Sequence, residues 1–401
     1  VFIFDENILS KLDKEDARIS FIHDEIQRVK KQYQQYGSDL FVYSGDPIKL
    51  IPEIAKEFAC TRVYTNRDYE PYALDRDKKI FDLLNEQNIN FIGSKDHVIF
   101  EKSEVVKNDG TPYLVFTPYS KKWKALFSDQ SKQEYNTIGL VDSLIQVKEK
   151  QNLIDLKAMG FEYTPQAIPQ KEVAKDIIQS YRNSRDFPSR NGTSRLGIHL
   201  RFGTISIREL VNQSENLSET FINELIWRDF YQMIIFHFPH SAENSFRKEY
   251  DLIEWEKNMD HFELWCLGKT GYPIVDAGMR ELNKTGYMHN RVRMIVASFL
   301  TKHLLIDWRL GEAYFASKLL DYELASNIGG WQWAAGSGCD AAPYFRIFNP
   351  TTQQQKFDGT FEYINKWIPE FGSSSYPDPI VDHKFARERA LNRFKIGLKK
   401  I

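Results

Sequence analysis

The chain has 401 residues, 42% of them hydrophobic, which is enough apolar material for two or three domains with separate cores. Its 53 basic and 55 acidic residues nearly cancel, so binding to a polyanion would need a local basic patch. The three cysteines, Cys60, Cys266 and Cys339, are scattered and lack metal-ligand spacing, which favours reduced thiols in a cytoplasmic protein. Because no apolar run approaches the roughly 18 residues of a membrane span, we expect no membrane partner.

Residues 1–117 alternate short apolar strands with helices. We expect strands at 1–4, 40–43 and 61–64, and helices at 19–36 and 47–58. Short strands joined by helical crossovers are typical of a doubly wound parallel sheet, so this region is predicted to be an α/β domain. No glycine-rich loop with the dinucleotide spacing follows these strands, which argues against a nicotinamide site.

Residues 118–157 are polar and rich in lysine, and we interpret them as a connector between domains. From 158 to 401 the apolar residues recur at spacings of three and four, which is typical of helices with one buried face. The clearest of these helices are expected at 221–238, 277–282, 290–305 and 311–320. The architecture is therefore predicted to be an α/β domain followed by a larger all-helical domain.

The first segment with chemical character is 223–231. Glu224, Trp227, Arg228 and Tyr231 fall at spacings of three and four, so they share one helix face. A solvated stripe holding an ion pair is one interpretation. The helix continues, however, into an apolar run that looks buried on nearly every side, where Glu and Arg would need partners. A functional face is therefore an equally open interpretation.

The second segment is 286–294. Tyr287, Asn290, Arg291 and Met294 share a helix face, and Arg293 points to another. A single Asn or Met on a helix is usually structural. Two arginines beside Asn and His, however, suit an anionic or hydrogen-bonding ligand.

The third segment, 321–333, contains Asp321 and Glu323 but no His or Cys at ligand spacing, so a metal site is not predicted. Gly329 and Gly330 would allow a ligand to approach the backbone closely. Trp333 then precedes a run of small residues that could form the wall of a site for a flat substrate.

The fourth segment, Gly-Thr-Ser-Arg-Leu at 192–196, stands just before a helical pattern. Hydroxyls, backbone N–H groups and an Arg at a helix start can form an anion site, although Thr or Ser there is more often only an N-cap. Together the four segments predict a helical domain that encloses an anionic, aromatic cofactor such as a flavin or a nucleotide.

Long stretches of this sequence resemble the photolyase/cryptochrome family. They are Glu-Leu-Ile-Trp-Arg at 224–228, Lys-Thr-Gly-Tyr-Pro-Ile-Val-Asp at 269–276, His-Asn-Arg-Val-Arg at 289–293, Gly-Gly-Trp-Gln-Trp-Ala-Ala at 329–335, and 340–352. Their order and spacing match over about 181–356. The residues at 66–72 fit the family's antenna domain more loosely.

The resemblance implies FAD as cofactor, reduced in the active state and held in the helical domain. The turn at 193–197 would bind the diphosphate, and Asn327 would lie beside the flavin N5 atom. The positions that match the family's FAD site are Tyr181, Thr193, Ser194, Arg195, Leu196, Gly197, Phe221, Glu224, Arg228, Arg293, Asp321, Tyr322, Glu323 and Asn327.

The resemblance also implies a reaction, the light-driven repair of cyclobutane pyrimidine dimers in DNA. Excited, reduced FAD would pass an electron to a dimer flipped out of the helix, and the electron would return after the ring splits. Glu224 would hydrogen-bond the dimer and, with Asn327, act in catalysis. Trp265, Trp308 and Trp331 match the chain of tryptophans that reduces the flavin from the surface inward. The residues implied to contact the dimer or the DNA are Arg185, Trp227, Arg228, Asn290, Arg291, Met294, Trp333 and Arg346.

Three alternatives stay open at this point. Enzymes for the (6-4) photoproduct carry His where this chain has Asn290 and Met294, and many cryptochrome light sensors carry Asp or Cys where it has Asn327. A light-independent flavoprotein oxidoreductase is disfavoured by the missing nicotinamide loop. The pattern resembles bacterial class I enzymes, and we expect a monomer. Glu323 is a departure, because many class I members have Asp there.

The α/β domain fits the family less well. The family's usual opening strand, which is central in the sheet, is missing, so we expect the sequence to be an amino-terminal truncation of a longer protein. An antenna pigment, methenyltetrahydrofolate or a deazaflavin, could bind between the domains. The residues do not decide between the two pigments.

Overall fold

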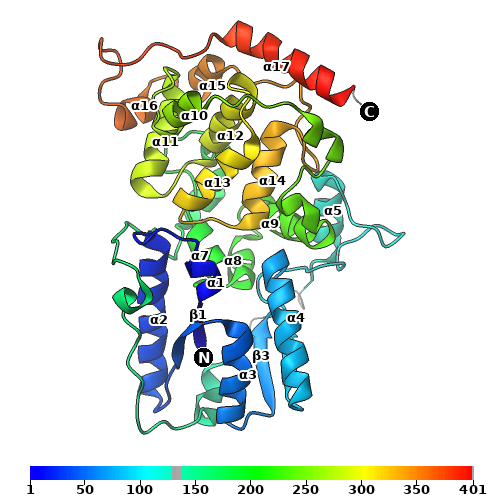
Figure 1. The fold of residues 1–401 in the computed structure, drawn as a ribbon, viewed down its shortest axis with the longest axis vertical. Helices are drawn as coiled ribbons and strands as arrows, with labels where there is room; N and C mark the ends of the chain where they lie inside the picture. The colour runs from blue at the N-terminus through cyan, green and yellow to red at the C-terminus, as the bar shows by residue number, and fades with distance from the viewer. Residues whose placement is uncertain (129–132, 134, 136, 400–401) are drawn as a thin grey trace. The chain divides into compact units, whose positions relative to one another are not determined.

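The computed structural model describes residues 1–128, 133, 135 and 137–399 (Figure 1). The chain divides into two compact units. The first comprises residues 1–99, 128–168 and 202–209, and the second comprises 100–127, 169–201 and 210–401. Among the described residues, no helix is both long and apolar enough to cross a membrane.

The first unit combines four short strands with helices. They are β1 (Phe2–Asp5), α1 (Glu6–Leu9), α2 (Ala17–Gln35), β2 (Val42–Gly45), α3 (Pro47–Glu57), β3 (Arg62–Asn66), α4 (Pro71–Glu86) and β4 (Asn90–Ser94), with short 3₁₀ turns at Ile138–Ser143 and Leu156–Met159. The predicted strands and helices are present within a few residues of their expected ends. The prediction of an α/β region with parallel strands is confirmed.

The parallel strands form two pairs. β1 pairs with β2 in the register Phe2 with Val42, and β3 pairs with β4 in the register Arg62 with Asn90. Among the described residues no ladder joins the two pairs, so the single sheet expected from the sequence is divided. Each pair is connected by a helix, α2 or α4, as parallel strands require.

The predicted connector is largely part of the first unit. The Gln151 side chain accepts a hydrogen bond from the backbone N–H of Val42 at 2.9 Å, and the Gln151 N–H donates to Asp39 at 2.9 Å. Asp39 also holds the buried Lys30 at 2.7 Å. Residues 128–168 therefore belong to the first unit, whereas 100–127 belong to the second.

The second unit is helical. Its helices are α5 (Phe116–Leu126), α6 (Lys175–Ser184), α7 (Gly197–Arg201), α9 (Glu219–His237), α10 (Met259–Cys266), α11 (Pro273–Thr285), α12 (Asn290–Ser298), α13 (Trp308–Lys318), α14 (Leu324–Ala335), α15 (Pro350–Phe357), α16 (Glu362–Trp367) and α17 (His383–Leu398), with 3₁₀ turns at Pro239–Ala242 and Lys248–Leu252. Helix α8 (Ile207–Ser214) has residues of both units. The four helices predicted from periodicity correspond to α9, α11, α12 and α13.

Helix α14 packs against α9, α12 and α13 within the helical unit (Figure 1). As predicted, α9 is buried on nearly every side beyond Glu224, with Ile226, Phe230 and Met233 almost completely enclosed. The helix predicted at 290–305 differs from expectation, because after Ser298 it widens into a π-helical turn, Phe299–His303. This turn carries Lys302, whose buried ammonium donates to the Ala335 carbonyl at 2.7 Å.

The adjacent Gly329 and Gly330 differ in their surroundings, and this difference gives a stability prediction. A Cβ at Gly329 would overlap the Tyr231 ring on α9, whereas a Cβ at Gly330 would meet no atom within 4 Å. The group that approaches the backbone closely at Gly329 is therefore the Tyr231 ring. We expect Gly329→Ala to lower the free energy of unfolding by about 1–3 kcal/mol through overpacking. The matched Gly330→Ala should raise it by about 0.5–1 kcal/mol, and urea denaturation of both variants checks this. Equal effects at the two positions would contradict the packing.

Candidate functional site

The second and third sequence segments are joined by an ion pair. The Arg293 guanidinium on α12 donates to both carboxylate oxygens of Asp321, at 2.9 and 3.1 Å. Its Nε atom donates to the Met288 carbonyl at 2.8 Å. A guanidinium held by a bidentate carboxylate and a carbonyl has one orientation, so α12 and the start of α14 are fixed to each other at this point.

A second ion pair joins the first and third segments. Arg228 Nε on α9 lies 3.4 Å from Glu323 Oε1, with the two side chains 11% and 6% exposed. Glu323 also accepts a hydrogen bond from the Ser326 hydroxyl. Because both charges are almost enclosed, the ion pair offsets part of the cost of burying each of them. Arg228 also donates to the Leu200 carbonyl at 3.4 Å. The sequence analysis predicted that a buried Arg228 would need a partner. That partner is Glu323, about one hundred residues further along the chain.

Asn327 is oriented by a residue that the sequence did not indicate. Its Nδ2 donates to Glu312 Oε1 on α13 at 2.9 Å, and the Tyr322 hydroxyl lies 3.3 Å from the same oxygen. Burial raises the pKa of Glu312, and these two hydrogen bonds oppose the shift. The amide nitrogen of Asn327 is thus directed to Glu312.

The turn at 193–197 meets the other segments. Thr193 Oγ1 lies 3.3 Å from the Tyr287 hydroxyl, and the Arg195 guanidinium lies 4.8 Å from the centre of the Tyr287 ring. A Cβ at Gly197 would be 2.7 Å from Asp321 Oδ2, so only glycine fits there. Ser194 is half-buried and Leu196 is buried. All four segments are therefore brought together.

His289 is a second residue that sequence reasoning did not assign. Its Nδ1 accepts the backbone N–H of Arg291 at 3.1 Å, which caps α12 and places the proton of the neutral ring on Nε2. Among the described residues Nε2 has no partner, although the side chain is only 3% exposed. Burial, with Arg293 and Arg291 nearby, lowers the pKa of His289 to about 4. A neutral, buried donor of this kind suits a ligand.

Glu224 is held by an arginine predicted to contact DNA. The Arg185 guanidinium at the end of α6 forms an ion pair with Glu224 on α9. Burial raises the pKa of Glu224, and the nearby Arg185 opposes this shift. Tyr181 stands edge-on to Phe221, with ring centres 5.2 Å apart. The structure thus brings one expected catalytic residue, one DNA contact and two expected cofactor contacts into a single cluster.

Arg291 is paired in a similar way, with an acid that the sequence analysis missed. Its Nη2 donates to Asp186 Oδ1 at 2.6 Å, and its Nη1 lies 3.7 Å from Met294 Sδ. The guanidinium also lies 4.4 Å from the centre of the Phe357 ring. Asp186 directly follows Arg185 in the chain. Two consecutive residues therefore form the ion pairs to α12 and α9.

The remaining expected substrate residues are more open. Trp227 is partly buried and stacks on Phe116, whereas Trp333 lies 6.3 Å from Phe348, measured between ring centres. Asn290 and Arg346 are exposed. Among the described residues no hydrogen bond or ring contact joins these four side chains directly, so their common role stays a prediction.

The three tryptophans expected to carry electrons are all enclosed. Trp265, Trp308 and Trp331 are 0%, 1% and 2% exposed. Trp265 lies 6.0 Å from Trp331 in an edge-on arrangement, and its Nε1 donates to the Val296 carbonyl. Trp265 is therefore a direct neighbour of Trp331. An electron path that starts at the surface would need an exposed group beyond these three.

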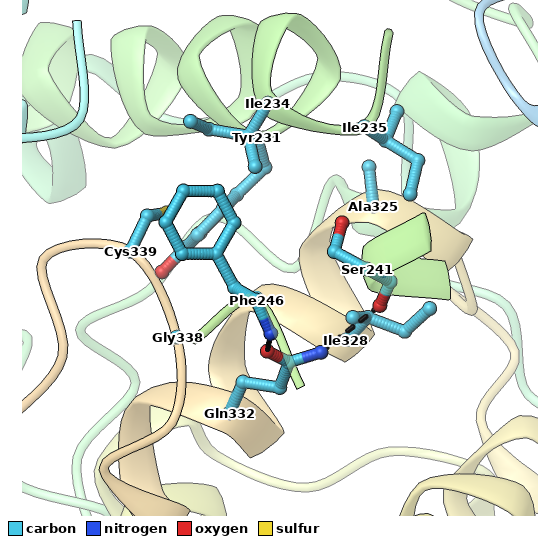
Figure 2. Close-up of a pocket in the computed structure, with 11 residues that line it drawn as sticks. Tyr231, Ile234, Ile235, Ser241, Phe246, Ala325, Ile328, Gln332, Gly338 and Cys339 are labelled. Carbon is cyan, nitrogen blue, oxygen red and sulfur yellow. Dashed lines mark hydrogen bonds between the residues drawn. The ribbon is translucent and has the colours of Figure 1, made fainter. Parts of the chain in front are cut away.

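A small cavity of about 20 Å³ lies between α9 and α14 (Figure 2). Its wall is mostly apolar and includes Ile234, Ile235 and Ile328. The Gln332 side chain crosses one side, where its Nε2 donates to the Ser241 carbonyl at 2.9 Å and its Oε1 accepts from the Phe246 N–H at 2.8 Å. This volume has room for about one water molecule, so the cavity is far too small to hold a dinucleotide cofactor.

The cluster fits FAD in its chemistry. It offers Arg228 and Arg293 for anionic groups and a turn with backbone N–H groups for a diphosphate. It also offers His289 Nε2 as a buried donor that has no partner in the part of the chain that the structure describes. An α/β unit combined with a helical unit built around such a cluster defines a protein that binds a large, anionic, aromatic cofactor.

Comparison with known proteins identifies the family. Residues 221–375 match the family model described as the FAD binding domain of DNA photolyase, and residues 1–136 match the model described as DNA photolyase. The chain belongs to the DNA photolyase family and contains that family's FAD-binding domain. The resemblance inferred from the sequence motifs is thereby confirmed.

Individual relatives of the chain belong to the same family. A deoxyribodipyrimidine photo-lyase from Synechococcus is 35% identical, with 97% of this chain and 89% of the relative covered. A bacterial class III photolyase from Agrobacterium tumefaciens superposes with a TM-score of 0.84 at 32% identity and covers all of this chain, with 91% of its own length matched. A cryptochrome from Synechocystis gives 0.81 at 26% identity, with 97% and 92% covered. The fold prediction is confirmed, and the class within the family stays a prediction.

Proposed function

We propose that the chain repairs cyclobutane pyrimidine dimers in DNA by light-driven electron transfer. The observation that carries this proposal is the convergence of the four segments in a member of the photolyase family, with Asn327 held beside them by Glu312. Arg228, Arg293 and the turn at 193–197 would hold FAD, which in its reduced form would supply an electron under blue light. The electron enters the dimer, both bonds of the cyclobutane ring break, and the electron returns, so no net oxidation occurs.

The protein's own residues bind and polarise the dimer. Glu224 hydrogen-bonds the dimer once a DNA phosphate has replaced it as the partner of Arg185. In its protonated form, which burial favours by raising its pKa, it stabilises the negative charge that develops on the dimer. Trp227 and Trp333 pack against the pyrimidine rings, and Asn290 and Met294 line the same pocket. Extruding the dimer costs less than extruding a normal pair, because a dimer already stacks poorly.

Arginines bind the DNA backbone. We assign this role to Arg185, Arg291 and Arg346, with Arg228 at the border between cofactor and substrate. Since neutralised phosphates release counterions, binding weakens as salt rises. The protein acts as a monomer in the cytoplasm of a bacterium, and its antenna pigment is methenyltetrahydrofolate or a deazaflavin.

Two other functions are disfavoured by particular residues. Repair of the (6-4) photoproduct would call for histidines at the positions of Asn290 and Met294. A cryptochrome-like light sensor has the same fold, as the Synechocystis relative illustrates. Asn327 favours repair over signalling, because many sensors have Asp or Cys there.

A repair assay separates these functions. The reduced protein with bound FAD is incubated under blue light with oligonucleotides that contain either a cyclobutane dimer or a (6-4) photoproduct, and restored thymines are measured. Repair of the dimer alone, and only in light, is expected. Failure to repair the dimer in light would refute the proposed substrate, and equal repair in darkness would refute the mechanism.

Trp331→Phe should separate flavin reduction from repair. Trp331 is buried in the helical core, and we assign it to the path that delivers electrons to oxidised flavin. Phenylalanine preserves most of the packing but is much harder to oxidise. We expect the rate of photoreduction of oxidised FAD to fall at least about tenfold, which is measured from the flavin absorbance. Chemically reduced enzyme should repair dimers normally. Loss of both activities would show that Trp331 has a different role.

A further inference from the structure

The ring of Trp227 is stacked on an aromatic residue from another helix. Phe116, the first residue of α5, lies parallel to Trp227 on α9, with ring centres 3.8 Å apart and planes inclined by 3°. Both side chains are partly buried. The two residues are 111 positions apart, so nothing in the local sequence indicates this contact.

A parallel stack this close requires support from its surroundings. Aromatic pairs prefer offset or edge-on arrangements with centres about 4.5–7 Å apart. The support comes from Phe230, which is fully buried and stands nearly perpendicular to both rings, 6.0 Å from Phe116 and 5.5 Å from Trp227. Phe116 and Trp227 therefore stand side by side against a rigid base.

The backbone of Phe116 is also fixed. Its N–H, one of the groups that a helix start leaves without a helical partner, donates to Asp340 Oδ2 at 3.0 Å. Further along α5, the Trp123 Nε1 donates to Asp229 on α9 at 2.9 Å, and Lys124 pairs with Glu219 at 2.6 Å. With α5 fastened to α9 at these points, the Phe116 ring has little freedom to move away from Trp227.

We propose that Phe116 is a positioning residue for lesion recognition, which covers one face of the Trp227 indole and fixes the plane against which a flipped-out dimer packs. This inference rests on the proposed function, in which Trp227 contacts the dimer. Tyr231, with its ring centre 5.4 Å from that of Trp227 and its plane tilted by 32°, borders the indole without stacking on it in parallel. Phe116 thus acts on the substrate only through Trp227.

Removal of the Phe116 ring should weaken discrimination between damaged and undamaged DNA. In Phe116→Leu the indole is no longer held in one plane, and we expect the affinity for dimer-containing oligonucleotide to fall about three- to tenfold, which is the size of effect expected for loss of an aromatic stack. The affinity for the undamaged oligonucleotide should not change, because the phosphate-binding arginines are untouched. Phe116→Tyr keeps a flat ring and should restore discrimination.

The experiment measures binding of both oligonucleotides by fluorescence anisotropy with FAD-loaded protein. The matched control is Phe127→Leu, since Phe127 stacks on Trp123 at the other end of α5, 4.9 Å away, and not on Trp227. A change in the ¹⁹F resonance of 5-fluorotryptophan at position 227 should accompany Phe116→Leu and be absent in Phe127→Leu. Flavin content and melting temperature are recorded for every variant.

Trp227→Ala distinguishes the possible failures. If Trp227→Ala leaves dimer binding unchanged, the proposed role of Trp227 fails and the inference fails with it. If Trp227→Ala weakens dimer binding but Phe116→Leu does not, only the positioning role is overturned. Tighter dimer binding by Phe116→Leu would also overturn it, because Phe116 would then occupy the place of a base.

Discussion

Glu224→Ala is expected to lower the yield of dimer repair roughly tenfold or more, while the Kd for dimer-containing DNA changes much less. In the proposed mechanism the side chain stabilises charge that exists only after the electron has entered the dimer, so its loss should raise the barrier to ring splitting more than it weakens binding. A hydrogen bond to a charged group contributes about 1.5–3 kcal/mol, which corresponds to a factor of about ten or more in rate. Single-flash repair yields and equilibrium binding on the same preparation check both parts.

The pH dependence of repair gives an independent test of Glu224. Burial raises the pKa of this carboxyl, so at a given pH more of it is protonated than for an exposed glutamate. As the pH rises through the raised pKa, the proton that Glu224 would donate is lost, and the repair yield should fall. Glu224→Gln keeps a donor at every pH, and its profile should be flat over that range. Parallel profiles for wild type and Glu224→Gln would contradict the assignment.

Glu323→Ala is expected to cause the largest loss of stability. It leaves the nearly enclosed charge of Arg228 without its carboxylate, 3.4 Å away. Removing one partner of a buried pair costs about 3–5 kcal/mol, so urea denaturation should begin at clearly lower concentration and FAD should be released more readily. The shorter Glu323→Asp should retain most of the stability, because Asp still supplies a negative charge.

An exposed pair serves as the control for Glu323. Lys79 and Asp75 lie 2.7 Å apart with side chains 55% and 61% exposed, and Asp75→Ala should change stability by less than about 1 kcal/mol. In the double variant Glu323→Ala with Arg228→Met, much of the loss should be recovered, since no unpaired charge remains buried. If Glu323→Ala and Asp75→Ala are equally mild, the buried pair has no special role.

Elements with a strong apolar period were predictable from the sequence. Helix α9 and the strands β1 to β3 were expected within a few residues, because burial of one face or of a whole strand dictates residue choice along the chain. The boundary of the connector was less predictable. Gln151 belongs to the first unit through hydrogen bonds to Val42 and Asp39, and composition does not reveal such long-range bonds.

The candidate site was predictable where its residues lie in motifs and not where they act through distant contacts. Arg228 clearly required a partner, but only the fold identifies it as Glu323. Three further residues orient the expected site residues, but their sequence spacing from those residues gives no sign of the contact. They are Glu312, Asp186 and His289. The glycine pair at 329 and 330 was expected to admit a ligand, whereas at Gly329 the nearest group is the Tyr231 ring.

The ion pairs of Arg185 with Glu224 and of Asp186 with Arg291 have a consequence for how the protein searches DNA. In the absence of DNA, each arginine is already neutralised by a carboxylate of the same protein, in keeping with a net charge of −2. If these arginines bind the DNA backbone as proposed, a phosphate must exchange places with a carboxylate before the arginine binds it. Under the proposed function, such an exchange would make contacts with intact duplex brief, so that the protein would leave undamaged DNA quickly.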